Sequence, residues 1–117
     1  ADIALGVPYN IAGYALILEL FSHLTGIRAG VFGHTLVDAH VYTCKPDGSD
    51  SEYDHVPGLL EQLKRVPRKL PQIKISDSIK SLDDIEDILD ASTEQILDIF
   101  QISNYRPYEA IKFRVAV

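Results

Sequence analysis

The chain opens with the segment that decides its fold, Asp2-Ile-Ala-Leu-Gly-Val-Pro-Tyr-Asn-Ile-Ala-Gly-Tyr14. Pro8 suits the first turn of a helix, where its missing N–H has no partner to lose. From Tyr9 to Thr25 the residues are apolar on nearly every side, which predicts a long buried helix. Asn10 is therefore expected at the N-terminal, positively polarised end of that helix. An acid, a Gly-Pro elbow and an Asn beside an apolar segment are typical of a ligand-binding elbow.

A second set of polar residues follows on the segment from Val31 to Thr43. The residues alternate there, so that Asp38, His40 and Tyr42 share one face of an expected strand, while small and β-branched residues form the other face. Two polar sets on two rigid elements predict one pocket.

The rest of the chain predicts an α+β architecture in a single domain over residues 1–117. Residues 44–58 are polar and rich in Pro and Gly, which is typical of a loop. The periodicity of the later segments predicts a short amphipathic helix over Leu59 to Val66 and a strand over Leu70 to Ser76. It also predicts one or two acidic helices over Leu82 to about Leu97, and two short closing strands over Phe100 to Ser103 and Ile111 to Val115.

The composition excludes several classes of protein. With 117 residues, 46% of them hydrophobic and 24% charged, the chain has the composition of one globular domain. A formal charge of −6 and a pI near 5.0 argue against nucleic-acid binding, which needs a basic face. The apolar runs are too short for a membrane span, and no signal peptide is recognisable. One Cys cannot form an internal disulfide, which favours a reducing compartment, the cytoplasm by default.

Three blocks of sequence resemble, in the same order, the C-terminal portion of the thymidylate synthase family. They are LGVPYNIAGYAL at residues 5–16, VDAHVY at residues 37–42 and YRPYEAIKFRVAV at residues 105–117, and residues 44–57 and 78–97 fit least well. The resemblance implies a twisted mixed β-sheet packed on the long buried helix, in a homodimer. It also implies an enzyme that reductively methylates dUMP to dTMP with 5,10-methylenetetrahydrofolate as co-substrate.

The same resemblance implies that the catalytic Cys and an Arg-Ser phosphate site lie upstream of Ala1. The chain then contains no catalytic residue, and it is expected to be inactive alone. Cys44 is not expected to be the nucleophile, because it follows the polar strand at the start of a loop. Two alternatives remain, a hydroxymethylase of dCMP or dUMP with the same fold and a non-catalytic module.

For the nucleotide, the resemblance implies contacts from Asp2, Asn10, Asp38, His40 and Tyr42. The carboxamide of Asn10 both donates and accepts hydrogen bonds, so it complements O4 and N3–H of uracil, whereas the relatives that hydroxymethylate dCMP carry Asp there. His40 and Tyr42 are assigned to the 3′-hydroxyl of the ribose. From the residues alone, Asn10 capping its own helix and a His-Tyr pair satisfied by backbone remain alternatives.

For the folate, the resemblance implies contacts from Asp2, Leu5, Gly6, Tyr9, Ala116 and Val117. A carboxylate at Asp2 suits the paired N–H donors of a pterin ring, and the C-terminal tail is expected to close over the bound ligands and exclude water. Four positions depart from the usual family residues, at Tyr9, Gly13, Leu36-Val37 and Tyr108-Glu109.

No metal site is predicted, because His23 in the long helix has no partner at metal-ligand spacing and His55 lies in the polar loop. The basic cluster from Lys64 to Lys69 is interpreted as a solvated face in preference to a phosphate site.

Overall fold

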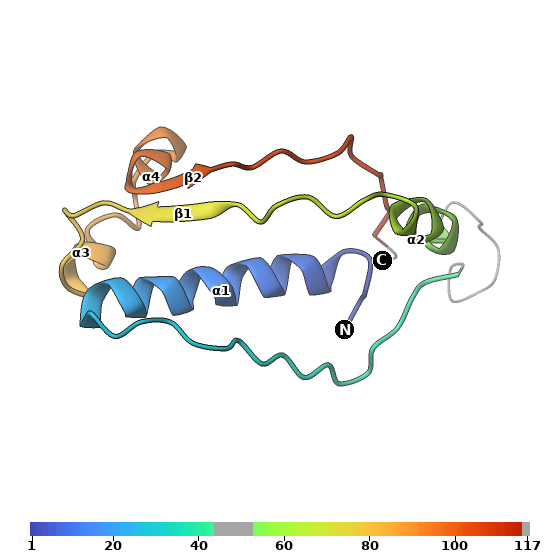
Figure 1. The fold of residues 1–117 in the computed structure, drawn as a ribbon, viewed down its shortest axis with the longest axis horizontal. Coiled ribbons are helices and arrows are strands. Elements are labelled where there is room, and N and C mark those ends of the chain that lie inside the picture. The colour runs from blue at the N-terminus through green and yellow to red at the C-terminus, as the bar shows by residue number, and fades with distance from the viewer. Residues whose placement is uncertain (44–52, 116–117) are drawn as a thin grey trace. The chain divides into compact units, whose positions relative to one another are not determined.

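The structure, a computed structural model, describes residues 1–43 and 53–115 (Figure 1). In chain order its elements are α1 (Gly6–Thr25), α2 (Val56–Leu63), β1 (Gln72–Ile75), α3 (Asp83–Glu86), α4 (Thr93–Ile99) and β2 (Phe100–Ser103). The mixture of helices with an antiparallel pair of strands agrees with the predicted α+β class.

The chain forms two compact units. One comprises Ala1–Gly13, Gly33–Arg68 and Pro107–Val117, and the other comprises Tyr14–Phe32 and Lys69–Arg106. The assignment of residues 1–117 to a single domain stays a prediction.

Helix α1 confirms the predicted long helix, but it begins at Gly6 rather than at Tyr9. Asp2 stabilises the beginning of the helix through two hydrogen bonds. Its backbone oxygen accepts from the N–H of Val7 at 2.8 Å, and its Oδ1 accepts from the N–H of Ala4 at 2.9 Å. Pro8 lies in the first turn, where no intrahelical donor is needed. Asn10 is therefore one turn inside the helix, so the prediction that it lies at the N-terminal end is wrong, and it does not cap the helix.

The predicted burial of α1 is not found. Of its side chains only Val7 is buried by the residues that the structure describes, and Tyr14 and Phe21 are 57% and 51% exposed. A helix that is apolar on every side needs cover on every side. The described elements supply that cover only in part.

The predicted strand from Val31 to Thr43 is replaced by an isolated parallel bridge between Asp2 and His40. The N–H of Ile3 donates to the carbonyl oxygen of His40 at 3.0 Å, and the N–H of His40 donates to that of Ala1 at 3.0 Å. Asp38 has a φ of 51°, which ends the extended alternation just before the bridge. A strand needs a neighbour for its backbone groups, and no other bridge to this segment occurs in residues 1–43 and 53–115.

The only sheet in the described part of the chain is the antiparallel pair of β1 and β2, so the implied twisted mixed sheet is not observed. The register runs from Gln72 opposite Ser103 to Ile75 opposite Phe100, and Figure 1 shows the two strands side by side. Both strands were predicted, and Ile75 is buried as the alternation indicates. In the same unit, His23 Nε2 lies 2.8 Å from the carbonyl oxygen of Ile79, which is also buried.

The helices of the second half begin close to their predicted positions. The acidic stretch forms α3 and α4, and a capping box between Ser92 and Gln95 starts α4. Helix α2 begins at Val56 rather than Leu59, with Pro57 in its first turn. The closing strand predicted for Ile111 to Val115 does not form, because its residues contact side chains near α2 instead of pairing with a neighbouring strand. The part of the predicted loop at residues 44–52 lies outside the described residues.

Candidate functional site

The bridge between Asp2 and His40 joins the two polar sets that the sequence singled out. The side chains of Asp2 and His40 are 18% and 35% exposed, so both are partly shielded. The ring of Tyr42 meets that of His40 edge to face, with centroids 5.2 Å apart and planes at 78°. The structure therefore brings together Asp2 from the first polar set and His40 and Tyr42 from the second.

Asp38 lies at the edge of this group. Its carbonyl oxygen is 2.8 Å from His40 Nδ1, its Oδ2 is 3.6 Å from the same nitrogen, and its side chain is 86% exposed. The carbonyl oxygen can only accept, so His40 Nδ1 carries a proton and donates. His40 thereby presents its other nitrogen, Nε2, as the one available to a ligand.

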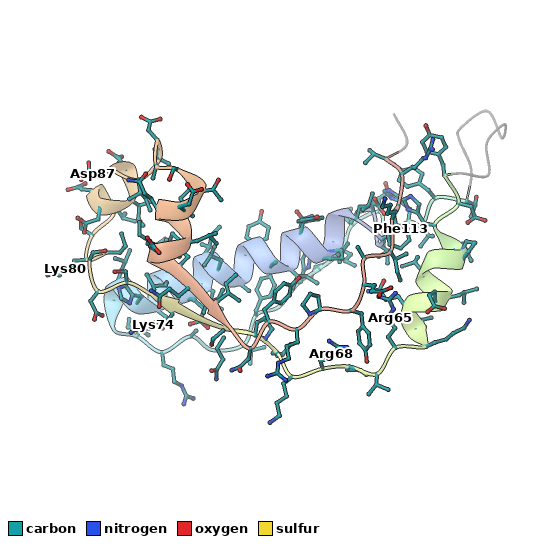
Figure 2. All side chains as sticks on the ribbon, turned by 90° about the horizontal axis from the view of Figure 1, so that it is seen from above. Arg65, Arg68, Lys74, Lys80, Asp87 and Phe113 are labelled. Atoms are coloured by element: carbon teal, nitrogen blue, oxygen red, sulfur yellow. The ribbon has the colours of Figure 1, made fainter. Side chains whose placement is uncertain are left out.

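A chain of aromatic rings continues inward from His40 and Tyr42. Tyr42 meets His55 edge to face at 5.5 Å, and His55 meets Phe113 at 5.1 Å. Such edge-to-face pairs are a favourable arrangement of aromatic rings. Figure 2 labels Phe113 on the last segment of the chain, close to α2.

His55 is the residue that the sequence interpretation missed. It was placed in a polar loop, yet it is 1% exposed and immediately precedes α2. The Val56-Pro57 pair that follows it is a helix-start signal that could have drawn attention to it.

Of the remaining predicted residues, those that the structure describes are not joined to this group by hydrogen bonds. Asn10 is exposed, and its side chain makes no hydrogen bond to residues 1–43 or 53–115. Tyr9 is 78% exposed, while Leu5 and Gly6 are half-buried. A Cβ at Gly6 would lie 3.7 Å from that of Asp2, an ordinary contact. Ala116 and Val117, like Cys44, lie outside the residues that the structure describes.

The basic cluster, interpreted as a solvated face, binds the segment at residues 107–109. Arg65 Nη1 donates to the carbonyl oxygen of Glu109 at 2.7 Å, and Arg68 Nη1 donates to that of Pro107 at 3.0 Å. The guanidinium of Arg68 lies 3.7 Å from the ring centroid of Tyr108, which is a cation–π contact. Figure 2 labels both arginines, which lie beside an open groove of about 610 Å³.

The described part of the chain holds no group of three or more His, Cys, Asp or Glu side chains suited to a metal ion. None of its helices is long and apolar enough to span a membrane.

Comparison with known proteins gives the class of protein. The family model described as thymidylate synthase matches residues 1–117. The chain is 40% identical over 117 residues to the thymidylate synthase of Herpesvirus ateles, and 37% identical over 116 residues to that of Homo sapiens. These alignments cover 100% and 99% of the chain but only 33% and 31% of the relatives, so the chain spans about a third of their length.

The chain therefore belongs to the thymidylate synthase family, and the resemblance found in its three sequence blocks is confirmed.

Proposed function

We propose that these residues form the base, ribose and folate contacts of an enzyme that methylates dUMP to dTMP with 5,10-methylenetetrahydrofolate. The observation that carries the proposal is the backbone bridge between Asp2 and His40, with Tyr42 against the His40 ring. It supports a single site in which a folate-binding acid and a ribose-binding histidine are neighbours. When bound, the folate supplies both the carbon and the hydride.

On the nucleotide side, we assign the base to Asn10 and the 3′-hydroxyl of the ribose to His40 and Tyr42. An exposed carboxamide at Asn10 has its donor and its acceptor available for the uracil edge. Asp2 and Asp38 complete the predicted nucleotide contacts, Asp38 by its place beside His40.

On the folate side, the residues fit the chemistry of a pterin. Asp2 keeps carboxylate surface accessible while Oδ1 accepts the N–H of Ala4, so Oδ2 is suited to ligand N–H donors. Leu5, Gly6 and Tyr9 follow directly in the chain and give the apolar part of the same surface. Ala116 and Val117 are proposed to close over the folate.

The bond-forming thiol is proposed to come from an upstream segment, and the 117 residues alone are proposed to be inactive. The support is that the relatives are about three times as long as this chain. We also propose a homodimer in the cytoplasm. Val31 and Val37, on the face expected to pack, are 98% and 80% exposed and available to a partner, and a single Cys suits a reducing compartment.

Substrate choice tests the proposal through Asn10. In the complete protein that carries these residues, dUMP turnover is followed by the absorbance of dihydrofolate and compared with dCMP turnover. Asn10→Asp should lower kcat/KM for dUMP by about tenfold or more and shift the preference toward dCMP, because a carboxylate cannot donate to O4. Glu19→Gln, another change of charge in α1, should leave the preference unchanged.

An unchanged preference in Asn10→Asp would refute the role of Asn10. Turnover of dCMP but not dUMP by the wild type would point to the hydroxymethylase, and turnover of neither would point to a non-catalytic module. Turnover by the 117 residues alone would contradict the upstream position of the thiol.

A further inference from the structure

His55 connects parts of the first unit that are far apart in sequence. Its backbone N–H donates to the carbonyl oxygen of Tyr42 at 2.9 Å. Its ring places Nε2 2.8 Å from the carbonyl oxygen of Arg114 and Nδ1 3.8 Å from Oδ1 of Asp2. One buried side chain thus contacts the elbow, the ribose segment and the last segment of the chain.

The contact with Arg114 fixes where the proton lies. A carbonyl oxygen can only accept a hydrogen bond, so Nε2 of His55 carries a proton and donates. The opposite nitrogen, Nδ1, is turned toward the carboxylate of Asp2, and no residue that the structure describes makes a hydrogen bond to it. Buried polar atoms without a partner are rare and call for a specific explanation.

The explanation lies in what the ring holds in place. Oδ1 of Asp2 accepts the hydrogen bond from the N–H of Ala4 at 2.9 Å and lies 3.8 Å from Nδ1 of His55, so the buried ring borders the carboxylate on one side. The opposite end of the ring fixes Arg114, and Phe113 packs against its side. The orientation of Asp2 and the position of the last segment therefore depend on the same imidazole.

We propose that His55 is a positioning residue for the folate half of the site, holding the Asp2 carboxylate and the Phe113–Arg114 segment in one arrangement. The inference rests on the proposed function, in which Asp2 and the tail bind folate. It assigns His55 no contact with the reacting atoms. On the nucleotide side, His55 contacts Tyr42 through its backbone N–H, which a side-chain substitution leaves in place, and through an edge-to-face contact of the two rings at 5.5 Å.

Two substitutions separate the two ends of the ring. In His55→Gln the carboxamide reaches the level of Nε2 and can still donate to Arg114. In His55→Asn it reaches only the level of Nδ1 and loses that contact. His23→Gln is the matched control, because His23 also places Nε2 2.8 Å from a carbonyl oxygen, that of Ile79, in the other unit.

The measurement is steady-state kinetics of the complete protein with each substrate varied in turn. His55→Asn should raise KM for methylenetetrahydrofolate about tenfold, which corresponds to roughly one buried hydrogen bond. It should raise KM for dUMP less, because Tyr42 keeps its backbone bond and loses only the ring contact. His55→Gln should recover most of the loss. A His55→Asn variant whose two KM values rise to the same extent, or whose folate KM matches that of His23→Gln, would overturn the proposal.

Nitrogen NMR of the wild-type histidines decides the question where a variant fails to fold or the wild type does not turn over dUMP. The His55 ring should carry its proton on Nε2, and its signals should shift more on addition of dihydrofolate than on addition of dUMP alone. A proton on Nδ1 of the His55 ring, or ring signals that do not change when dihydrofolate is added, would overturn the inference. Absence of dUMP turnover in the wild type would instead refute the proposed function.

Discussion

Gly58 and Gly13 offer a test of how the last segment packs on α2. Both are helical glycines, so the same change to Ala acts on both through the same propensity term. A Cβ at Gly58 would lie 2.5 Å from Cε1 of Phe113 and 3.0 Å from Cγ2 of Ile111, whereas a Cβ at Gly13 meets nothing within 4 Å. The two substitutions should therefore change stability in opposite directions.

The magnitude follows from two terms. Replacing Gly by Ala inside a helix stabilises by up to about 1 kcal/mol, and this term is shared by both sites. Forcing an extra carbon into a packed contact costs about 1–3 kcal/mol. Gly13→Ala should then raise the free energy of unfolding by up to about 1 kcal/mol. The free energy of unfolding of Gly58→Ala should be about 1–3 kcal/mol lower than that of Gly13→Ala.

The assay is urea denaturation of the complete protein, with the midpoints of wild type, Gly13→Ala and Gly58→Ala compared at equal slope. Phe113 contacts His55, so a ring displaced by the new methyl group also disturbs the proposed folate half. If Gly58→Ala stabilised as much as Gly13→Ala, the packing of Phe113 against α2 would be refuted.

Two further predictions concern the helix starts of the second unit. Ser92→Ala removes the hydroxyl that accepts from the N–H of Gln95 and should lower stability by about 1 kcal/mol, read from the urea midpoint; an unchanged midpoint would contradict the capping box. The N–H of Lys80, then the hydroxyl and N–H of Ser81, hold the pKa of Asp84 below its ordinary value of 3.8. A depressed pKa gives stability that is present above the ordinary value and lost as the pH falls through the folded value. The difference in Tm between wild type and Asp84→Asn should therefore be larger at about pH 6 than at about pH 2.5, and a difference independent of pH would argue against these hydrogen bonds.

Local patterns predicted a helix and a strand that the structure contains. The strand at Phe100–Ser103 forms as predicted, and the helix through Tyr9 to Thr25 forms with an earlier start. The predicted strands at Val31 to Thr43 and Ile111 to Val115 fail because alternation describes only one strand of a pair. In the described part of the chain the first forms a single isolated bridge, between His40 and Asp2, and the second packs near α2.

In the candidate site, too, some residues were predicted from local patterns and others were not. Alternation placed His40 and Tyr42 together, and the structure agrees because the two rings touch. The helix start was misplaced because Pro8 is compatible with any position in a first turn, and this moved Asn10 inward. His55 was missed because its contacts, at Asp2, Tyr42 and Arg114, come from distant parts of the sequence and no local pattern reports them.

The nucleotide half and the folate half of the proposed site depend on different contacts. The backbone bridge from Asp2 to His40 supports both halves, because it fixes the folate-binding acid and the ribose-binding histidine at once. The side chain of His55 contacts Asp2 and Arg114 and also the ring of Tyr42, so it supports chiefly the folate half. Loss of the bridge should therefore raise both KM values to a similar extent, whereas loss of the His55 ring should raise KM for folate more than KM for dUMP. The ratio of the two KM values then identifies which connection a substitution has broken.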